Sequence, residues 1–396
     1  MLIALFVLGL LIVAAHIVVF WRTVRHVPFL SSLAWPVPAS WPRVSIVIPA
    51  RNEAAELEEA LRSKLALDYP SLELVVVNDR STDGTGAILD ALAAEDGRIV
   101  PVHLDALPEG WLGKVHAMHR GIEASSGSYL LLSDADVHFA PGSLRKAIGW
   151  AESEGLDHVT ALPTVRTTGL LLQATLTSVL RLILAILRPW AVKDPASSAS
   201  AGVGAFNLFR RSAYARTPGL AWLRMEVGDD VGLGQMLKLS GARSAVVNAR
   251  GELSLKFYSS LGELTRHMEK SPGVGGLAPA VYMAFAAAIW ILELAPFVLA
   301  LSPAAPSWMR AAAAVLALGS VGQAMAMSRW LGQPVLPGLL TPVGATFFCG
   351  VALRASALAA LRGGIVWRDT FYPRDALRAG ARFRIMPRPR RVSQGS

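Results

Sequence analysis

The sequence is poor in charge and contains a single cysteine, and each scarcity excludes a class of protein. Only 17% of the 396 residues are charged, whereas 53% are hydrophobic and the mean hydropathy is +0.43. This composition is too apolar for a soluble chain of this length, and it predicts a membrane protein with one soluble domain. Cys349 alone excludes an intramolecular disulfide and fits a reducing cytoplasmic face, while its apolar neighbours favour a role in packing.

Two common phosphate-binding motifs are also missing from the first predicted strands. No Gly-x-Gly-x-x-Gly follows residues 44–48, which argues against a dinucleotide-binding domain for hydride transfer. The stretch Gly84-Thr85-Gly86 is not followed by Lys-Ser or Lys-Thr, which argues against a phosphate loop of the NTPase kind. A nucleotide site in this chain must therefore be built in another way.

Three short apolar segments each run directly into polar residues. They are residues 44–48, 74–77 and 129–132. Nearly continuous apolar character is typical of parallel strands that are buried on both faces. Helical patterns over residues 53–67 and after Thr82 alternate with these strands, which predicts an α/β domain with a mostly parallel sheet. Right-handed crossovers would place all three polar ends at one edge of the sheet, where ligands bind.

The third strand leads into Asp134-Ala135-Asp136 at that predicted edge. The side chains of Asp134 and Asp136 would lie on the same side of the chain and could share one hard cation. Such a cation, Mg²⁺ or Mn²⁺, would in turn take oxygens from a diphosphate. A solvated acidic turn is the alternative interpretation when this motif is taken alone.

Long apolar runs at both ends of the chain predict membrane segments. Residues 1–21 are followed by basic residues, which favours an N-outside anchor over residues 1–25 rather than a cleaved signal peptide. Three further runs, within residues 276–361, cover 277–301, 309–328 and 337–361. Residues 362–396 form a basic tail, which the positive-inside rule places in the cytoplasm, beside anionic lipid headgroups rather than nucleic acid.

The three C-terminal runs conflict with a cytoplasmic tail. If the soluble domain is cytoplasmic and all three runs cross the membrane, the tail ends outside. One run is therefore expected to be re-entrant or interfacial, and Arg310 and Gln323 make the middle one the strongest candidate.

Residues 168–191 are apolar enough to suggest a further crossing, but polar residues fall on one face. Gln173, Thr177, Arg181 and Arg188 follow helical spacing, which predicts an amphipathic helix lying in the membrane interface. A core helix of the soluble domain is the alternative.

Five motifs, in this order and spacing, resemble family 2 glycosyltransferases with the GT-A fold. The motifs are Pro49-Ala50-Arg51-Asn52-Glu53, residues 77–85, Gly113-Lys114, Asp134-Ala135-Asp136 and residues 228–233. The resemblance covers roughly residues 43–270 and implies a catalytic domain over residues 40–270. Residues 107–114 are similar to the membrane-bound branch that glycosylates lipids, which includes hopanoid-associated, carotenoid and ceramide glycosyltransferases.

The resemblance implies a role for each motif on the donor side. The positions implied to bind the nucleotide sugar are Pro49, Arg51, Glu53, Val77, Asp79, Lys114 and Asp134. The family usually has two adjacent acids after the second strand, whereas here Asn78 stands in the first position and leaves Asp79 as the expected ligand.

On the acceptor side, the resemblance implies that Asp230 is the base, with Asp229 beside it. One base without a second nucleophile implies a single displacement with inversion, although an acidic helix cap is an alternative for this pair. Gly204 and Asn207 fall in the implied acceptor loop. Arg266 and His267 stand where many membrane members have Gln-x-x-Arg-Trp, and the missing Trp favours one transfer onto a lipid over polymer synthesis.

We therefore expect an inverting, metal-dependent hexosyltransferase in the inner membrane, with several crossings and a cytoplasmic catalytic domain. Its partners would be a UDP-sugar, a lipid hydroxyl and the membrane. A polyprenyl-phosphate sugar transferase, a non-catalytic nucleotide-sugar-binding scaffold and a transporter are the alternatives. The first of these has an acceptor that is already ionised, so it would not need Asp230.

Overall fold

The computed structural model describes residues 1–384 and divides the chain into two compact units. A helical unit contains residues 1–26, 165–188 and 257–379. A sheet unit contains the remaining described residues, 27–164, 189–256 and 380–384. The predicted tail arginines Arg388, Arg390 and Arg391 lie outside the described residues.

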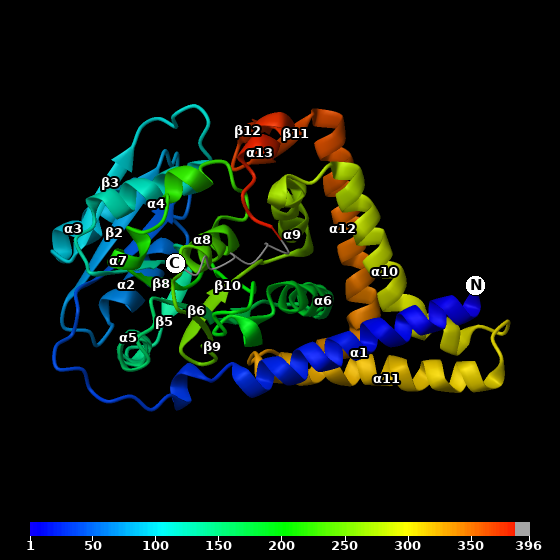
Figure 1. Cartoon of the computed structure of the whole chain (residues 1–396). Helices are drawn as coiled ribbons and strands as arrows, with labels where there is room; N and C mark the ends of the chain where they lie inside the picture. The colour runs from blue at the N-terminus through cyan, green and yellow to red at the C-terminus, as the bar shows by residue number, and fades with distance from the viewer. Residues whose placement is uncertain (385–396) are drawn as a thin grey trace, which may run out of the picture. The chain divides into compact units, whose positions relative to one another are not determined.

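A mixed, mostly parallel sheet of seven strands forms the core of the sheet unit (Figure 1). The strand order is β3-β2-β1-β4-β8-β6-β9, and only β8 runs antiparallel to its neighbours. The strands are β1 Val44–Ala50, β2 Leu72–Asp79, β3 Ile99–Leu104, β4 Tyr129–Leu132, β6 His158–Leu162, β8 Asn207–Arg210 and β9 Ser244–Asn248. The three strands expected from the apolar segments are therefore present, and both faces of β1, β2 and β4 are buried as expected.

Helices and short strands complete the sheet unit. The helices are α2 Leu57–Leu65, α3 Thr85–Glu95, α4 Gly113–Ala124, α5 Ser143–Ser153, α7 Arg211–Tyr214 and α8 Asp229–Leu239. The strands β5 Val137–Phe139 and β10 Leu253–Lys256 pair antiparallel, and β7 Thr164–Arg166 begins at the last residue before the chain enters the helical unit. The sequence pattern predicted a helix from residue 53, but α2 begins at Leu57, because residues 51–56 form the polar turn after β1.

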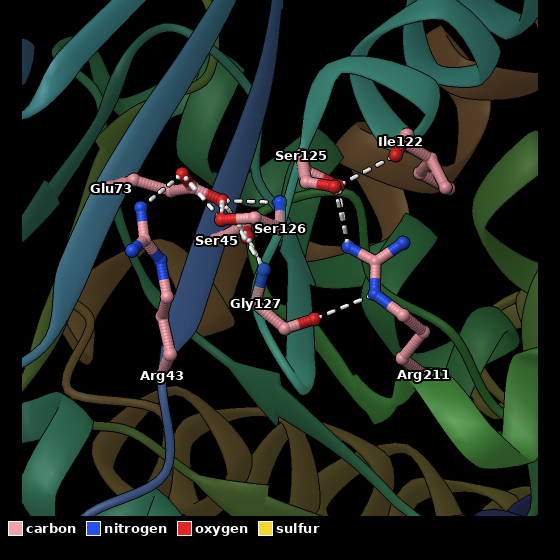
Figure 2. A network of polar contacts seen from close by, with 8 residues as sticks. All are labelled: Arg43, Ser45, Glu73, Ile122, Ser125, Ser126, Gly127 and Arg211. Carbon is pink, nitrogen blue, oxygen red and sulfur yellow. Dashed lines mark hydrogen bonds and ion pairs between the residues drawn. The ribbon is translucent and has the colours of Figure 1, made fainter.

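A buried carboxylate joins the amino ends of β1, β2 and β4, at the edge opposite the polar strand ends (Figure 2). Glu73 accepts hydrogen bonds from Ser45, from the backbone N–H of Ser126 at 2.6 Å and from Arg43 at 2.7 Å. The backbone N–H of Gly127 donates to Ser45 Oγ at 2.7 Å. Burial alone would raise the pKa of Glu73, but these donors lower it to about 2. The carboxylate therefore stays charged and holds the three strand starts together.

The helical unit contains five helices that are long and apolar enough to cross a membrane, among the described residues. These segments are Leu2–His26, Leu170–Ala191, Pro279–Leu301, Ser307–Trp330 and Leu336–Arg362. They correspond to α1 Leu2–His26, α6 Leu170–Leu187, α10 Pro279–Leu301, α11 Ser307–Trp330 and α12 Thr341–Arg362. The expected N-terminal and C-terminal membrane helices are thus present. Residues 364–380, expected as tail, instead form β11 Gly364–Trp367, β12 Thr370–Pro373 and α13 Arg374–Gly380.

The structure shows which way the predicted polar face of α6 points. Thr177 and Arg181 turn into the helical unit and are buried there. The side chain of Arg181 is 1% exposed, and its guanidinium donates to His16 Nδ1 at 2.9 Å and to Ser320 Oγ at 3.0 Å. Glu293 Oε2 lies 3.3 Å from the same guanidinium. Polar groups among apolar helices pair with one another, because a lipid-facing orientation would leave them unsatisfied.

The domain boundaries also differ from those predicted. Residues 165–188 and 257–270 were expected within the catalytic domain, but they group with the helical unit. Residues 380–384 were expected in the tail, but they belong to the sheet unit. The interfacial position of α6 remains a prediction.

Candidate active site

The polar ends of the strands converge on one pocket in the sheet unit. It has a volume of about 240 Å³, part of which is open to solvent, and it brings together seven of the residues predicted for the site. These seven are Pro49, Lys114, Asp134, Gly204, Asn207, Asp229 and Asp230. Met118, Leu132, Ser133 and Leu233 complete the lining. Residues far apart in the sequence therefore meet at the carboxyl edge of the sheet, as the crossover rule predicts.

Lys114, in the first turn of α4, links the two acidic motifs. Its Nζ lies 2.7 Å from Asp134 Oδ1 and 3.3 Å from Asp229 Oδ2. Burial favours the neutral amine, but Asp134, Asp229 and Asp230 together raise the pKa of Lys114 above its usual value. A permanently charged ammonium at this point can neutralise phosphate oxygens. The alternative of a surface lysine is excluded, because the side chain is only 15% exposed.

Asp230, in the first turn of α8, is held by two backbone donors. Its Oδ2 accepts from the N–H of Gly204 at 3.1 Å, and its Oδ1 accepts from the N–H of Val231 at 2.8 Å. Burial and the charge of Asp229 raise the pKa of Asp230 to about 6, against the opposing effect of Lys114. A carboxylate with this pKa is ionised at neutral pH and is a stronger base than an exposed one. The N-cap of α8 is Gly228 and makes no side-chain capping bond, so the alternative of an acidic helix cap for Asp229 and Asp230 finds no support here.

The loop before β8 approaches both acidic motifs so closely that it requires glycine. A Cβ on Gly204 would lie 2.6 Å from Asp134 Oδ2, and a Cβ on Gly202 would lie 1.8 Å from the backbone oxygen of Asp230. The backbone oxygen of Gly204 also accepts from the N–H of Asp134 at 3.0 Å. The predicted acceptor loop therefore acts as a spacer that fixes Asp134 and Asp230 relative to each other. Asn207 lines the same wall but is buried, and its Oδ1 hydrogen-bonds to His158 Nε2 at 3.0 Å.

Asp134 and Asp136 have the chemistry of a divalent-cation site. Burial, followed by the charges of Asp134 and Glu53, raises the pKa of Asp136 to about 7. Carboxylates crowded in this way bind a cation favourably, and their oxygens suit Mg²⁺ or Mn²⁺. Asp134 and Asp136 thus have suitable donor atoms for the expected metal, while Asp134 Oδ1 is paired with Lys114 at 2.7 Å, and cation binding by the two acids stays a prediction.

On the nucleotide side, Asp79 is engaged by a residue that the sequence analysis missed. Arg80 donates to both oxygens of Asp79, at 2.7 and 3.0 Å, and Arg51 Nη1 lies 4.0 Å from Oδ2. Asp79 is 3% exposed. The position of Arg80, directly after the acid that ends β2, was a signal in the sequence. Because Arg80 adopts φ of 54°, its side chain folds back over Asp79 rather than continuing along the strand.

Other predicted donor residues do not line the pocket. Val77 is fully buried within β2, so only its backbone is available to a ligand. Arg51, Glu53, Asp79 and Asp136 belong to the same strand ends but are not among the residues that line the cavity. The backbone N–H of Glu53 donates to Thr85 Oγ1 at 2.9 Å, which joins the turns after β1 and β2.

Arg266 and His267 lie on α9, Leu261–His267, in the helical unit. They are not among the residues that line the pocket of the sheet unit. Glu263, in the place of the usual Gln, forms a capping box: its N–H donates to Ser260 Oγ at 3.1 Å, and its carboxylate accepts from the N–H of Ser259 at 2.7 Å. The departure from the family motif thus has a local structural role.

Comparison with known proteins agrees with this geometry. The family model described as Glycosyl transferase family 2 matches residues 45–217. The probable glycosyltransferase YdaM of Bacillus subtilis is 35% identical over 97 residues, which cover 24% of this chain and 23% of that protein. The beta-monoglucosyldiacylglycerol synthase of Synechocystis is 31% identical over 128 residues, which cover 32% of this chain and 26% of that protein. The chain thus spans well under half the length of these curated relatives.

A solved structure extends the comparison to the whole fold. The mannosyltransferase PcManGT from Pyrobaculum calidifontis, in complex with GDP-Man and Mn²⁺, aligns with a TM-score of 0.52 at 19% identity. The alignment covers 91% of this chain and 99% of that one, which shows a shared fold. The family match and the named relatives together identify residues 45–217 as a glycosyltransferase family 2 domain, and the shared fold agrees with the expected GT-A architecture.

Proposed function

We propose that the protein transfers a hexose from a UDP-sugar to a hydroxyl of a membrane lipid, with inversion, at the cytoplasmic leaflet of the inner membrane. The observation that carries this proposal is one pocket in which Asp230 faces Lys114 and Asp134. The candidate base and a candidate cation-binding acid therefore line the same pocket, which supports a role for both in one reaction. The similarity to a beta-monoglucosyldiacylglycerol synthase supports a lipid acceptor.

In this reaction Asp230 removes the proton from the acceptor hydroxyl, and the oxygen attacks the anomeric carbon as the nucleotide diphosphate leaves. The hydrogen bond from Gly204 to Asp230 Oδ2 orients the carboxylate. The ammonium of Lys114 stabilises the negative charge that develops on the leaving group. With a single base and no second nucleophile in the proposed site, the displacement inverts the anomeric carbon.

A divalent cation would be held by Asp134 and Asp136 and would neutralise the diphosphate of the donor. Two observations support it: the crowding of carboxylates that raises the pKa of Asp136, and the Mn²⁺ in the mannosyltransferase of similar fold. That mannosyltransferase also contains GDP-Man, so guanosine donors are a necessary comparison with uridine donors. A polyprenyl-phosphate acceptor is the second candidate. One relative is named as a beta-1,3-glucosyltransferase of an undecaprenol-linked glycan, which supports a polyprenol-linked substrate but implies a sugar hydroxyl as the acceptor.

The proposal is tested with the purified protein in detergent, Mn²⁺ and a total lipid extract. The donors are UDP-glucose, UDP-galactose, UDP-N-acetylglucosamine and GDP-mannose, and the readouts are nucleotide release and mass spectrometry of the lipids. We expect one lipid to gain a single sugar mass. Asp136→Asn should abolish transfer, whereas Glu95→Gln, an exposed acid on α3, should not change it. Unchanged turnover by Asp136→Asn in the presence of a chelator would disprove the metal assignment.

A further inference from the structure

The chain returns to the sheet unit at its C-terminal end and makes its contacts beside the proposed base. We call residues 380–384 the return segment. Glu226, three residues before Asp229, is fully buried. Its Oε2 accepts from the backbone N–H groups of Arg382 at 2.6 Å and Phe383 at 2.9 Å. Its Oε1 accepts from the N–H of Gly228 at 3.1 Å.

Further contacts fix the return segment along α8. Gln235 donates through Nε2 to the backbone oxygen of Arg384 at 2.8 Å and accepts from the N–H of Arg384 at 2.9 Å. The side-chain amide of Gln235 thus donates one hydrogen bond to the backbone of Arg384 and accepts one from it, as two paired residues of neighbouring β-strands do. Gly380 packs so closely that an added Cβ would lie 2.2 Å from the Cβ of Met225. The return segment is therefore held by contacts of its backbone, and these contacts would be lost if the segment shifted by one residue along α8.

These contacts converge on the loop that leads into Asp229 and Asp230. The backbone oxygen of Arg224, in the same loop, accepts from the N–H of Leu112 at 2.7 Å, directly before Gly113 and Lys114. The loop thus connects the start of α4 to the start of α8. A buried carboxylate needs its hydrogen bonds, and without the return segment Glu226 would lose both donors to Oε2. Glu226 would then have to turn toward water and move this loop.

We propose that the return segment is part of the catalytic unit and that Glu226, held by it, is a positioning residue for Asp230. The inference rests on the proposed function, because it assigns the effect to the glycosyl-transfer step. A displacement of the base by about 1 Å can lower kcat by roughly a hundredfold while leaving distant donor contacts intact. Glu226 and the return segment do not line the pocket, so donor affinity should change little.

Two truncations form a matched pair for the test. One ends after Ala379 and removes the return segment; the other ends after Arg384 and keeps it. Hydrogen exchange of the backbone amides in residues 225–231 measures docking without requiring activity. Steady-state kinetics with UDP-glucose or GDP-mannose and a total lipid extract then separate kcat from the donor KM. Glu226→Gln in the full chain is a third variant, which keeps the size of the side chain but removes its charge.

We expect the chain ending after Ala379 to exchange faster in residues 225–231 and to have a kcat lowered by roughly ten- to a hundredfold, with the donor KM within about threefold. Glu226→Gln should move both readouts in the same direction, and the chain ending after Arg384 should match the full chain. Equal exchange in the two truncations would overturn the docking, and faster exchange with unchanged kcat would overturn the positioning role. If the full chain is inactive with all four donors named above, the proposed function fails, while the exchange experiment still decides whether the segment docks.

Discussion

At the residue scale, the environment of Asp230 gives the proposed reaction a defined pH dependence. The carboxyl is buried beside Asp229, and these two effects raise its pKa to about 6 despite the nearby charge of Lys114. A base works only when it is ionised. The acid limb of the kcat profile should therefore lie near this pKa, well above that of an exposed aspartate.

We predict that Asp230→Asn lowers kcat by about 10²- to 10⁴-fold and removes the acid limb, because the amide cannot accept the proton. In the unmodified protein, kcat should fall about tenfold for each pH unit below 6. The measurement is kcat between pH 5 and 8, with nucleotide-sugar affinity as the check on folding. Near-normal activity of Asp230→Asn would instead favour an acceptor that is already ionised, such as a polyprenyl phosphate.

Individual site residues were predictable from sequence where strand ends or tight turns dictate their positions. Asp134 and Lys114 share one pocket because they follow β4 and β3, two parallel strands that end at one edge of the sheet, whereas the position of Asp230 at the start of α8 was implied only by the family resemblance. Glu226 and its partners were not predictable, because their bonds join residues more than 150 positions apart. Asp79 was predicted as a ligand, but its pairing with Arg80 depends on a left-handed backbone conformation that propensity alone does not indicate.

At the scale of elements, Glu73 links three strand starts through a single carboxylate. Its lowered pKa means that the folded state holds the ionised form more tightly than the unfolded chain does. This stabilisation is fully present above the unfolded pKa of about 4.3 and is lost as the pH falls through about 2.

We predict that Glu73→Gln lowers the free energy of unfolding by about 1–3 kcal/mol at pH 7, because buried donors lose a charged acceptor. The difference from the unmodified protein should shrink as the pH falls from about 4.3 toward 2. Denaturant unfolding in detergent, followed by tryptophan fluorescence, measures both. Arg43→Gln is the control with a smaller expected effect, since the Arg43 side chain is 53% exposed. A difference that is the same at pH 7 and pH 2.5 would contradict this account.

The helix α6 shows what the periodicity of a sequence can predict and what it cannot. The spacing of Thr177 and Arg181 correctly indicated one polar face, but not which way that face turns. Its direction depends on His16, Glu293 and Ser320, which come from three other helices. Tertiary partners of this kind are not visible within a helical window.

Removing Arg181 alone should lower the stability of the protein more than replacing both Arg181 and Glu293 by apolar residues. Arg181→Ala should destabilise the protein by about 3–5 kcal/mol, because Glu293 would be left as an uncompensated charge. The double variant Arg181→Leu with Glu293→Leu should be less destabilised than that single variant. Thermal unfolding in detergent compares them, with Arg310→Ala on the exposed side of α11 as a matched arginine control. A double variant that is less stable than Arg181→Ala would refute the charge-pair argument.

At the scale of the whole molecule, one folded unit cannot lie on both sides of a membrane. Residues 27–164, 189–256 and 380–384 all belong to the sheet unit. The chain leaves this unit before α6 and returns to it after α6, so we expect that α6 does not cross by itself, although its length and composition would allow it. For the same reason, we expect that α10, α11 and α12 do not all cross. The fold thus leads to the same expectation as the basic tail, which would end outside the cell if all three C-terminal runs crossed.

We predict that the sheet unit and the end of the described chain lie on one side of the membrane, and that two of the three C-terminal helices cross it. Single cysteines are placed at Gly97 in the sheet unit, at Arg378 in α13, and in the loops at Ala304 and Pro334, all in a Cys349→Ser background. An impermeant maleimide applied to spheroplasts should label neither Gly97→Cys nor Arg378→Cys until the cells are lysed. At least one of the two loop positions should react before lysis. Opposite labelling of Gly97→Cys and Arg378→Cys would contradict the prediction.

The division of the chain into alternating segments also affects how the protein responds to proteolysis. The chain passes between the two units five times, at 26/27, 164/165, 188/189, 256/257 and 379/380. A protease that cuts at 256/257 produces two fragments, and each fragment contains residues of both units. The C-terminal fragment would stay attached to the sheet unit through the hydrogen bonds of residues 382–384 to Glu226 and Gln235, and to the rest of the helical unit through residues 257–379. We therefore expect that the two fragments stay together after cleavage at this single connection.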